Sequence, residues 1–218
     1  MNTKIAAYIF DLDGTLLDTE IVWTNVTLDY LQGKGYPVTK EEITPIVYGR
    51  SWTDVYADIV EKFPELDMGL QKMQDEMAQV FYRHRDVTDV KIPGSVELLK
   101  SLSKEHPCCI VSGSPREHIA EAIEIMGVGE CLEFYLGASD YPFGKPHPSG
   151  FLLAAERMGA VPNQCVVFED SRVGITAAKA AGMKAVALAL PLHPKQDVSL
   201  ADIVLSDLSE FSPDMFNS

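Results

Sequence analysis

The chain has 218 residues and a mass of 24.0 kDa, which suits one domain or one domain carrying a sizeable insertion. Apolar residues make up 46% and charged residues 23%, a composition that excludes a disordered tail, a collagen-like fibre and a coiled-coil rod. The formal net charge is −14 and no basic stripe occurs, so we expect no nucleic-acid partner. No apolar run approaches the ~20 residues of a membrane span, so we expect no membrane partner either.

The cysteines and the first residues point to a reducing compartment. The apolar stretch at residues 5–10 is short and runs into acidic residues, so no signal peptide is expected. Cys108, Cys109, Cys131 and Cys165 contain no CxxC pair, which disfavours zinc and thioredoxin-like sites. We expect four reduced, mostly buried thiols and a cytoplasmic location.

The first predicted element is a short buried strand at residues 4–10, which ends at Asp11-Leu12-Asp13-Gly14. From residue 18 to about residue 85, apolar residues recur at helical spacing, and glycines and prolines mark the breaks. This stretch contains no convincing strand. It predicts helices over residues 21–31, 52–63 and 66–81.

After Pro93 the pattern becomes a repeated alternation of strand and helix. The expected strands lie at residues 108–111, 133–137, 165–168, 184–190 and 203–205, and the expected helices at residues 94–105, 115–126, 148–158 and 171–181. Such alternation favours a parallel sheet with helices on both faces. The predicted fold class is therefore α/β, with a Rossmann-like parallel-sheet core and an inserted all-α domain. The core would comprise residues 1–16 and 93–218, and the helical insertion residues 17–92.

Polar residues follow the predicted strands at the ends where ligands bind in open α/β sheets. They are Asp11 and Asp13, Ser112, Lys145 on a loop before a helix, and Glu169 with Asp170. These groups are far apart in the sequence, but a parallel sheet would bring them to one edge.

Asp11 and Asp13 stand two residues apart at the end of the first predicted strand. Such carboxylates repel each other unless a cation lies between them. Hard oxygen ligands favour Mg²⁺, and Asp170 is a candidate third ligand. A calcium loop is disfavoured, because counting from Asp11 the sixth residue is Leu16 and the twelfth is Val22, not glycine and glutamate. By itself, the pair could equally cap a turn.

The other polar residues suit a phosphate site. Ser112 precedes Gly113 and the start of a predicted helix, where a hydroxyl and backbone N–H groups can hold an anion, although such a sequence also occurs at ordinary helix starts. Lys145 lies in a proline-fixed loop and could hold a phosphate oxygen and a carboxylate together. Glu169 and Asp170 add repulsion at the end of an apolar strand, which a role around a metal would explain.

Taken together, these motifs resemble the haloacid dehalogenase-like hydrolase superfamily. Asp11-Leu12-Asp13-Gly14-Thr15 matches its first motif, and Ser112, Lys145 and Glu169-Asp170 match the next three in order. The helical insertion is similar to the C1-type cap of the subgroup that includes β-phosphoglucomutases and sugar-phosphate phosphatases. The resemblance implies a cap that excludes bulk water and selects the leaving group. The two short connections of the helical module predict that residues 18 to about 85 move as a body.

The resemblance also implies a role for each acidic residue. Asp11 would attack phosphorus and form an aspartyl phosphate, and Asp13 would protonate the leaving oxygen and then activate water. Mg²⁺ would be held by Asp11, by the backbone carbonyl of Asp13 and by Asp170, with Glu169 close by. The expected cofactor is therefore Mg²⁺.

The substrate is expected to be a small-molecule phosphate ester. Ser112, Gly113 and Lys145 would bind the phosphoryl group, and Arg50 and Trp52 in the cap are candidate contacts to the rest of the substrate. The expected activity is that of a Mg²⁺-dependent phosphatase acting on a sugar phosphate. We expect the protein to act as a monomer.

Two alternatives to the phosphatase are a sugar phosphomutase and an inert regulatory protein on the same fold. Family β-phosphoglucomutases place a histidine where this chain has Trp23 and an arginine where it has Trp52, which disfavours a mutase. An inert protein would be expected to have lost Asp11 or Lys145, and both are present. Asp13 also disfavours a dehalogenase, whose first motif lacks the second aspartate.

Overall fold

The structure is a computed structural model that describes residues 4–48, 50, 52–85, 88–191, 193 and 195–217. Contacts divide the chain into two compact units. The first, here called the sheet unit, comprises Met1–Leu17, Lys91–Pro191 and Lys195–Ser218; the second, the helical unit, comprises Asp18–Val90 and Leu192–Pro194. The sequence-based division falls after residues 16 and 92, and these domain boundaries stay a prediction.

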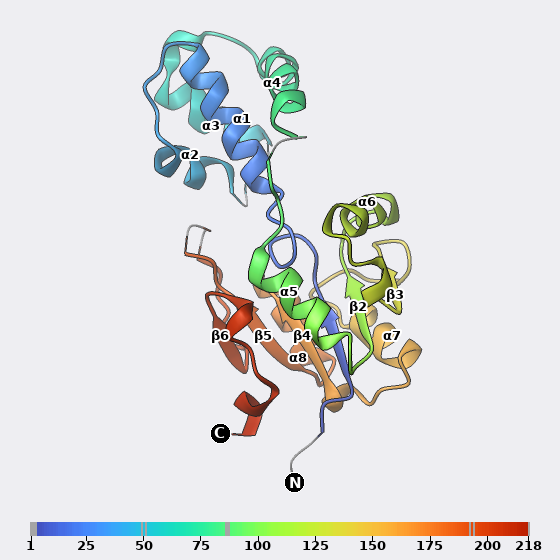
Figure 1. Cartoon of the computed structure of the whole chain (residues 1–218). Helices are drawn as coiled ribbons and strands as arrows, with labels where there is room; N and C mark the ends of the chain where they lie inside the picture. The colour runs from blue at the N-terminus through green and yellow to red at the C-terminus, as the bar shows by residue number, and fades with distance from the viewer. Residues whose placement is uncertain are drawn as a thin grey trace. The chain divides into compact units, whose positions relative to one another are not determined.

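The sheet unit contains a parallel sheet in the order β3-β2-β1-β4-β5-β6 (Figure 1). Every neighbouring pair of strands runs parallel. The strands are β1 (Ala7–Phe10), β2 (Cys108–Val111), β3 (Phe134–Leu136), β4 (Cys165–Glu169), β5 (Lys184–Leu188) and β6 (Ile203–Leu205). The predicted fold class and all six predicted strands are confirmed, with ends that differ by a few residues.

Helices cover both faces of the sheet, which explains why the central strands are buried at every position and are apolar except for Glu169 at the end of β4. Alternate strand residues pack against α7 (Ser149–Arg157) and α8 (Arg172–Ala180) in one buried cluster. On the other face, the rings of Tyr8, Phe168 and Phe211 pack together, with centroids 4.9 to 6.3 Å apart.

The remaining helices of the sheet unit are α5 (Pro93–Leu102) and α6 (Arg116–Met126). In Figure 1, α5 crosses in front of the sheet and α8 lies behind it. The helix α6 ends at Gly127, whose φ of 63° is the left-handed conformation that glycine adopts without strain.

The helical unit contains α1 (Glu20–Gly33), α2 (Lys40–Val47), α3 (Trp52–Lys62) and α4 (Leu70–Arg85), with a 3-10 turn at Pro64–Leu66. The sequence analysis missed α2. This helix is held by a capping box, in which Thr39 Oγ1 accepts from the Glu42 N–H and Glu42 Oε2 accepts from the Thr39 N–H. Pro45 lies inside the helix and obscured its short periodic pattern.

The thiols are as expected. Cys108, Cys109 and Cys165 are buried, Cys131 is half-buried, and all are free. Within the residues that the structure describes, no helix has both the length and the apolar character needed to cross a bilayer.

The chain order makes one edge of the sheet a natural ligand site. From the central strand β1 the chain continues to β2 and β3 on one side, and then returns to β4, β5 and β6 on the other. The carboxyl ends of β1 and β4 therefore lie at a topological switch point, where connections diverge and leave room for a ligand.

Candidate active site

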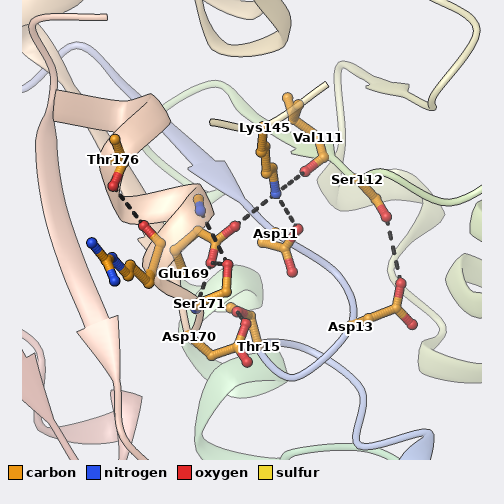
Figure 2. Close-up of polar contacts among 12 residues, drawn as sticks. Asp11, Asp13, Thr15, Val111, Ser112, Lys145, Glu169, Asp170, Ser171 and Thr176 are labelled. Atoms are coloured by element: carbon orange, nitrogen blue, oxygen red, sulfur yellow. Dashed lines mark hydrogen bonds and ion pairs between the residues drawn. The ribbon is translucent and has the colours of Figure 1, made fainter. Parts of the chain in front are cut away.

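Three of the predicted site residues, Asp11, Ser112 and Glu169, lie at the carboxyl ends of β1, β2 and β4. Asp11 directly follows β1, and its backbone N–H donates to the carbonyl of Phe168 on β4 at 2.9 Å. Ser112 follows β2, and its backbone N–H donates to the carbonyl of Leu136 at 3.0 Å. Glu169 ends β4. Backbone hydrogen bonds of the sheet thus fix the positions from which these side chains extend (Figure 2).

Lys145 lies at the centre of the site. Its ammonium group donates to Asp11 Oδ1, to Glu169 Oε1 at 2.7 Å and to the carbonyl oxygen of Val111 at 3.3 Å (Figure 2). Burial by itself would lower the pKa of Lys145, but the carboxylates of Asp11 and Glu169 raise it above the ordinary value. The lysine is therefore a fixed positive charge at neutral pH, in contact with two carboxylates.

Glu169 is held through both of its carboxylate oxygens. While Oε1 accepts from Lys145, Oε2 accepts from the backbone N–H and the hydroxyl of Ser171, each at 2.8 Å. A Cβ atom at Gly174 would lie 1.6 Å from Oε1, so only glycine fits at this position of α8. Ser171 also caps α8, because its hydroxyl accepts from the Gly174 N–H at 3.1 Å.

Asp11, Glu169 and Asp170 form a group that could hold a metal ion, since each offers an oxygen within 4.8 Å of the others. Asp170 lies close to Gly14, where a Cβ atom would be 2.3 Å from Asp170 Oδ2 and where φ is +84°. Thr15 Oγ1 donates to Asp170 Oδ1 at 3.4 Å. Gly14 therefore allows both a sharp turn and the close approach of this carboxylate.

The electrostatics of this acidic group suit a divalent cation. Burial raises the pKa of Asp11 well above its usual value, the neighbouring Glu169 and Asp170 raise it further, and Lys145 only partly opposes them. Among the described contacts, Lys145 pairs with the two carboxylates of Asp11 and Glu169, and Asp170 lies within metal-ligand reach of both. Oxygen ligands of this kind are the donors that hard divalent ions prefer.

The side chain of Asp13 contacts serine hydroxyls and is not part of the group of Asp11, Glu169 and Asp170. Its Oδ2 accepts from the hydroxyl of Ser114 at 2.7 Å and from the hydroxyl of Ser112 at 3.5 Å (Figure 2 shows the contact with Ser112). Its carboxylate therefore lies beside the predicted phosphoryl-binding serine. The predicted contact of Asp13 with a metal runs through its backbone carbonyl, and it stays a prediction.

Ser112 is almost fully buried and its surroundings are well defined. Its hydroxyl accepts from the Ser114 N–H at 3.0 Å, and its carbonyl accepts from the Tyr141 hydroxyl at 2.8 Å. A Cβ atom at Gly113 would meet nothing within 4 Å, so this backbone borders open space. The arrangement fits the predicted anion site.

The two predicted substrate contacts of the helical unit have partners within that unit. Arg50 Nη2 lies 3.0 Å from Asp58 Oδ2. The ring of Trp52 packs edge-on against Trp23, with centroids 4.7 Å apart, and Trp23 stacks on Phe81. These contacts give both residues a packing or pairing role, and their role in substrate binding stays a prediction.

Sequence reasoning missed Tyr141, Ser114 and Gly174 as parts of the site. None of them follows a strand directly in the sequence, and no spacing rule connects them to the motifs. Ser114 had the best signal, since it follows Ser112 by two residues in a loop already singled out.

Comparisons with known proteins agree with this geometry. Residues 5–182 match the haloacid dehalogenase-like hydrolase family. A Drosophila melanogaster relative named "Probable pseudouridine-5'-phosphatase" is 34% identical over 229 residues, which span 98% of this chain and 94% of the relative. Fructose-1-phosphate phosphatase YqaB of Escherichia coli K12 is 32% identical, over 85% of this chain and 97% of the relative.

A solved structure shares the fold at similar identity. It is a HAD family hydrolase from Deinococcus radiodurans R1, described with bound phosphate and sodium, with a TM-score of 0.77 and 28% identity over 95% of this chain and 93% of that one. The chain therefore belongs to the haloacid dehalogenase-like hydrolases. The relatives named here are phosphatases, and the chain is assigned to the same enzyme class, the phosphoric monoester hydrolases.

Proposed function

We propose that the protein is a Mg²⁺-dependent phosphatase that hydrolyses a small phosphate monoester, a sugar phosphate, through an aspartyl phosphate on Asp11. The observation that carries this proposal is the buried contact of Lys145 with Asp11 and Glu169, beside the Asp170 carboxylate. A buried nucleophile with a fixed ammonium group next to it suits attack on a phosphoryl group that brings its own negative charge.

The proposed reaction has two steps that share one set of residues. Asp11 attacks phosphorus while Ser112 and Lys145 neutralise charge on the phosphoryl oxygens, and Asp13 gives a proton to the departing alcohol oxygen. Asp13, now a carboxylate, then takes a proton from the water that hydrolyses the aspartyl phosphate. The products are the alcohol and inorganic phosphate.

Mg²⁺ would be held by Asp11, the backbone carbonyl of Asp13 and Asp170, and when bound it supplies positive charge to the phosphoryl oxygens. Glu169 would act mainly on Lys145, because Lys145 and Ser171 occupy both of its oxygens. The choice of Mg²⁺ over other divalent ions rests on the hard oxygen donors and on its affinity for phosphate oxygens.

The sugar-phosphate class is supported by the relatives. The named relatives act on pseudouridine 5′-phosphate and fructose 1-phosphate, and another, 28% identical, is named hexitol phosphatase B. All three substrates carry one phosphate on a polyhydroxylated carbon skeleton. Arg50 and Trp52 are the proposed contacts to that skeleton.

The test is a phosphate-release screen with Mg²⁺ over sugar phosphates, polyol phosphates and nucleotides, with the Asp11→Asn variant as the control. We expect release from a sugar or polyol phosphate and a loss of roughly a thousandfold or more in the variant, because an amide cannot act as the attacking carboxylate. Similar release by both proteins would overturn the mechanism. A phosphorylated isomer instead of free phosphate would identify a mutase.

A further inference from the structure

The carboxylate of Asp13 is held by two serine hydroxyls. Ser114 Oγ lies 2.7 Å from Asp13 Oδ2, whereas Ser112 Oγ lies 3.5 Å from the same oxygen. The first distance is typical of a well-formed O–H···O hydrogen bond, and the second is at the limit for such a bond. Ser114 is thus the closer of these two partners of the proposed general acid.

The hydroxyl of Ser112 has only one proton to donate. The Ser112 oxygen accepts a hydrogen bond from the Ser114 N–H at 3.0 Å. The hydroxyl can therefore donate its one proton either to Asp13 or to a phosphoryl oxygen, but not to both. A substrate that binds at Ser112 takes this proton away from Asp13. The hydrogen bond from Ser114 does not compete with the phosphoryl group in this way.

The backbone of Ser114 is anchored independently of its side chain. Its carbonyl accepts from the Ala138 N–H at 3.1 Å, and its N–H donates to Ser112. A Cβ atom at Gly137 would lie 2.9 Å from the Ser114 carbonyl oxygen, so the two loops pass each other closely. Replacing the side chain by alanine therefore leaves the loop in place and removes only the hydroxyl.

We propose that Ser114 is a positioning residue that orients the carboxylate of Asp13 toward the leaving oxygen while the phosphoryl group occupies Ser112. The inference rests on the proposed function and adds a residue that the motifs do not include. It requires no contact between Ser114 and the substrate, because Ser114 acts through Asp13.

The leaving group separates this role from a general structural one. A sugar alkoxide needs the proton that Asp13 delivers, whereas p-nitrophenolate departs as a stable anion. Ser114→Ala should lower kcat/KM for the best sugar phosphate about tenfold and for p-nitrophenyl phosphate by less than about threefold. The conservative Ser114→Thr variant keeps a hydroxyl and should restore most of the loss.

The experiment measures kcat/KM on both esters for the wild type, Ser114→Ala, Ser114→Thr and Ser103→Ala. Ser103 is the control, because its hydroxyl donates to the carbonyl of Lys100 at the end of α5. The Ser114→Ala change should also have little further effect when Asp13→Ala is already present. Equal losses on both esters, no loss on either, or a full additional loss in the Asp13→Ala background would each overturn the proposal.

The same data keep the two proposals apart. If the wild type releases no phosphate, or if Asp11→Asn is as active as the wild type, the proposed function fails. If turnover depends on Asp11 but Ser114→Ala behaves like the wild type on both esters, only the inference about Ser114 fails.

Discussion

The two units each contain a polar cluster, and the clusters differ in their balance of charge. In the helical unit, Asp18 accepts from the Tyr48 hydroxyl at 2.7 and 2.9 Å and lies 3.2 Å from His193 Nε2. Burial, with Asp18 beside it, raises the pKa of Tyr48, which keeps this donor neutral. One carboxylate is thus shared by a neutral hydroxyl and an imidazole.

In the sheet unit, the carboxylates of Asp11 and Glu169 share the ammonium group of Lys145, and Asp170 lies beside them. Burial of charge that is not fully compensated lowers stability, so the stability of the fold does not explain this cluster. We therefore expect the excess of buried negative charge, rather than the number of polar contacts, to distinguish the site of chemistry from an ordinary polar cluster.

Removal of the metal gives the largest expected effect. EDTA should abolish turnover and Mg²⁺ should restore it, while Ca²⁺ should support it poorly because its coordination is looser. The free energy of unfolding should rise with added Mg²⁺, since an ion that binds only the folded state stabilises it. Steady-state kinetics and thermal unfolding, with and without the ion, test both expectations, and full activity in EDTA would contradict the assigned role of the acidic group.

The pH dependence of the metal-free protein follows from Asp11. Because burial raises the pKa of Asp11 in the folded state above its value in the unfolded chain, its contribution to stability is favourable at low pH. That contribution is lost as the pH rises from the unfolded pKa through the folded one. Added Mg²⁺ should therefore raise the midpoint of thermal unfolding more at neutral pH than at pH 4. An equal shift at both pH values would contradict a raised pKa of Asp11 in the folded state.

Substitution of Lys145 has the next largest effect. Lys145→Ala should slow both a sugar phosphate and p-nitrophenyl phosphate by about a hundredfold or more, because it acts on the phosphoryl group in either ester. It should also destabilise the metal-free protein by about 3–5 kcal/mol, since it leaves the Asp11 and Glu169 carboxylates without their shared cation. Kinetics on the two esters and chemical denaturation measure these losses. A selective loss on one ester would place the lysine on the leaving group instead.

The fold of the sheet unit could be predicted because its rules are simple. Buried parallel strands are apolar at every position, and the carboxyl ends of such strands meet at one edge, so Asp11, Ser112 and Glu169 could be brought together from the sequence alone. Lys145 lies on a loop before a helix, and its place in the order of the family motifs indicates its role. Its contacts with Asp11 and Glu169 are tertiary, and no spacing in the sequence predicts them.

The helical unit was harder to predict for physical reasons. Its helix α2 is short and contains Pro45, so its start depends on the capping box of Thr39 and Glu42. The side-chain partners of Arg50 and Trp52 depend on how helices face each other, which spacing in the sequence does not fix. Tyr141 and Gly174 support the site through tertiary contacts, which no local sequence pattern predicts.

A smaller effect is expected from filling the space beside Glu169. Gly174→Ala places a Cβ atom where it would meet Glu169 Oε1 at 1.6 Å, so the carboxylate must move and loosen its hold on Lys145. We expect a loss of about 1–3 kcal/mol in stability and reduced turnover. Gly33→Ala in α1 is the matched control, because a Cβ atom there meets nothing within 4 Å, and it should be neutral or slightly stabilising. Equal behaviour of the two variants in denaturation and kinetics would contradict the close fit around Glu169.

The smallest effect on turnover, and the sharpest test of the helical unit, comes from Arg50. Its ion pair with Asp58 joins two partly exposed side chains and contributes at most about 1 kcal/mol, so the Arg50→Ala and Asp58→Ala variants should both stay folded. If Arg50 contacts the sugar, Arg50→Ala should change the ranking of sugar phosphates by a few-fold while p-nitrophenyl phosphate hydrolysis stays nearly constant, because only the sugar offers hydroxyls to the guanidinium. Asp58→Ala frees the same arginine without removing it and should leave the ranking as it is. Kinetics over three sugar phosphates and p-nitrophenyl phosphate compare the two variants directly. If both variants shift the ranking alike, or if neither does, Arg50 serves only to pair with Asp58, and the contacts that select the substrate lie elsewhere.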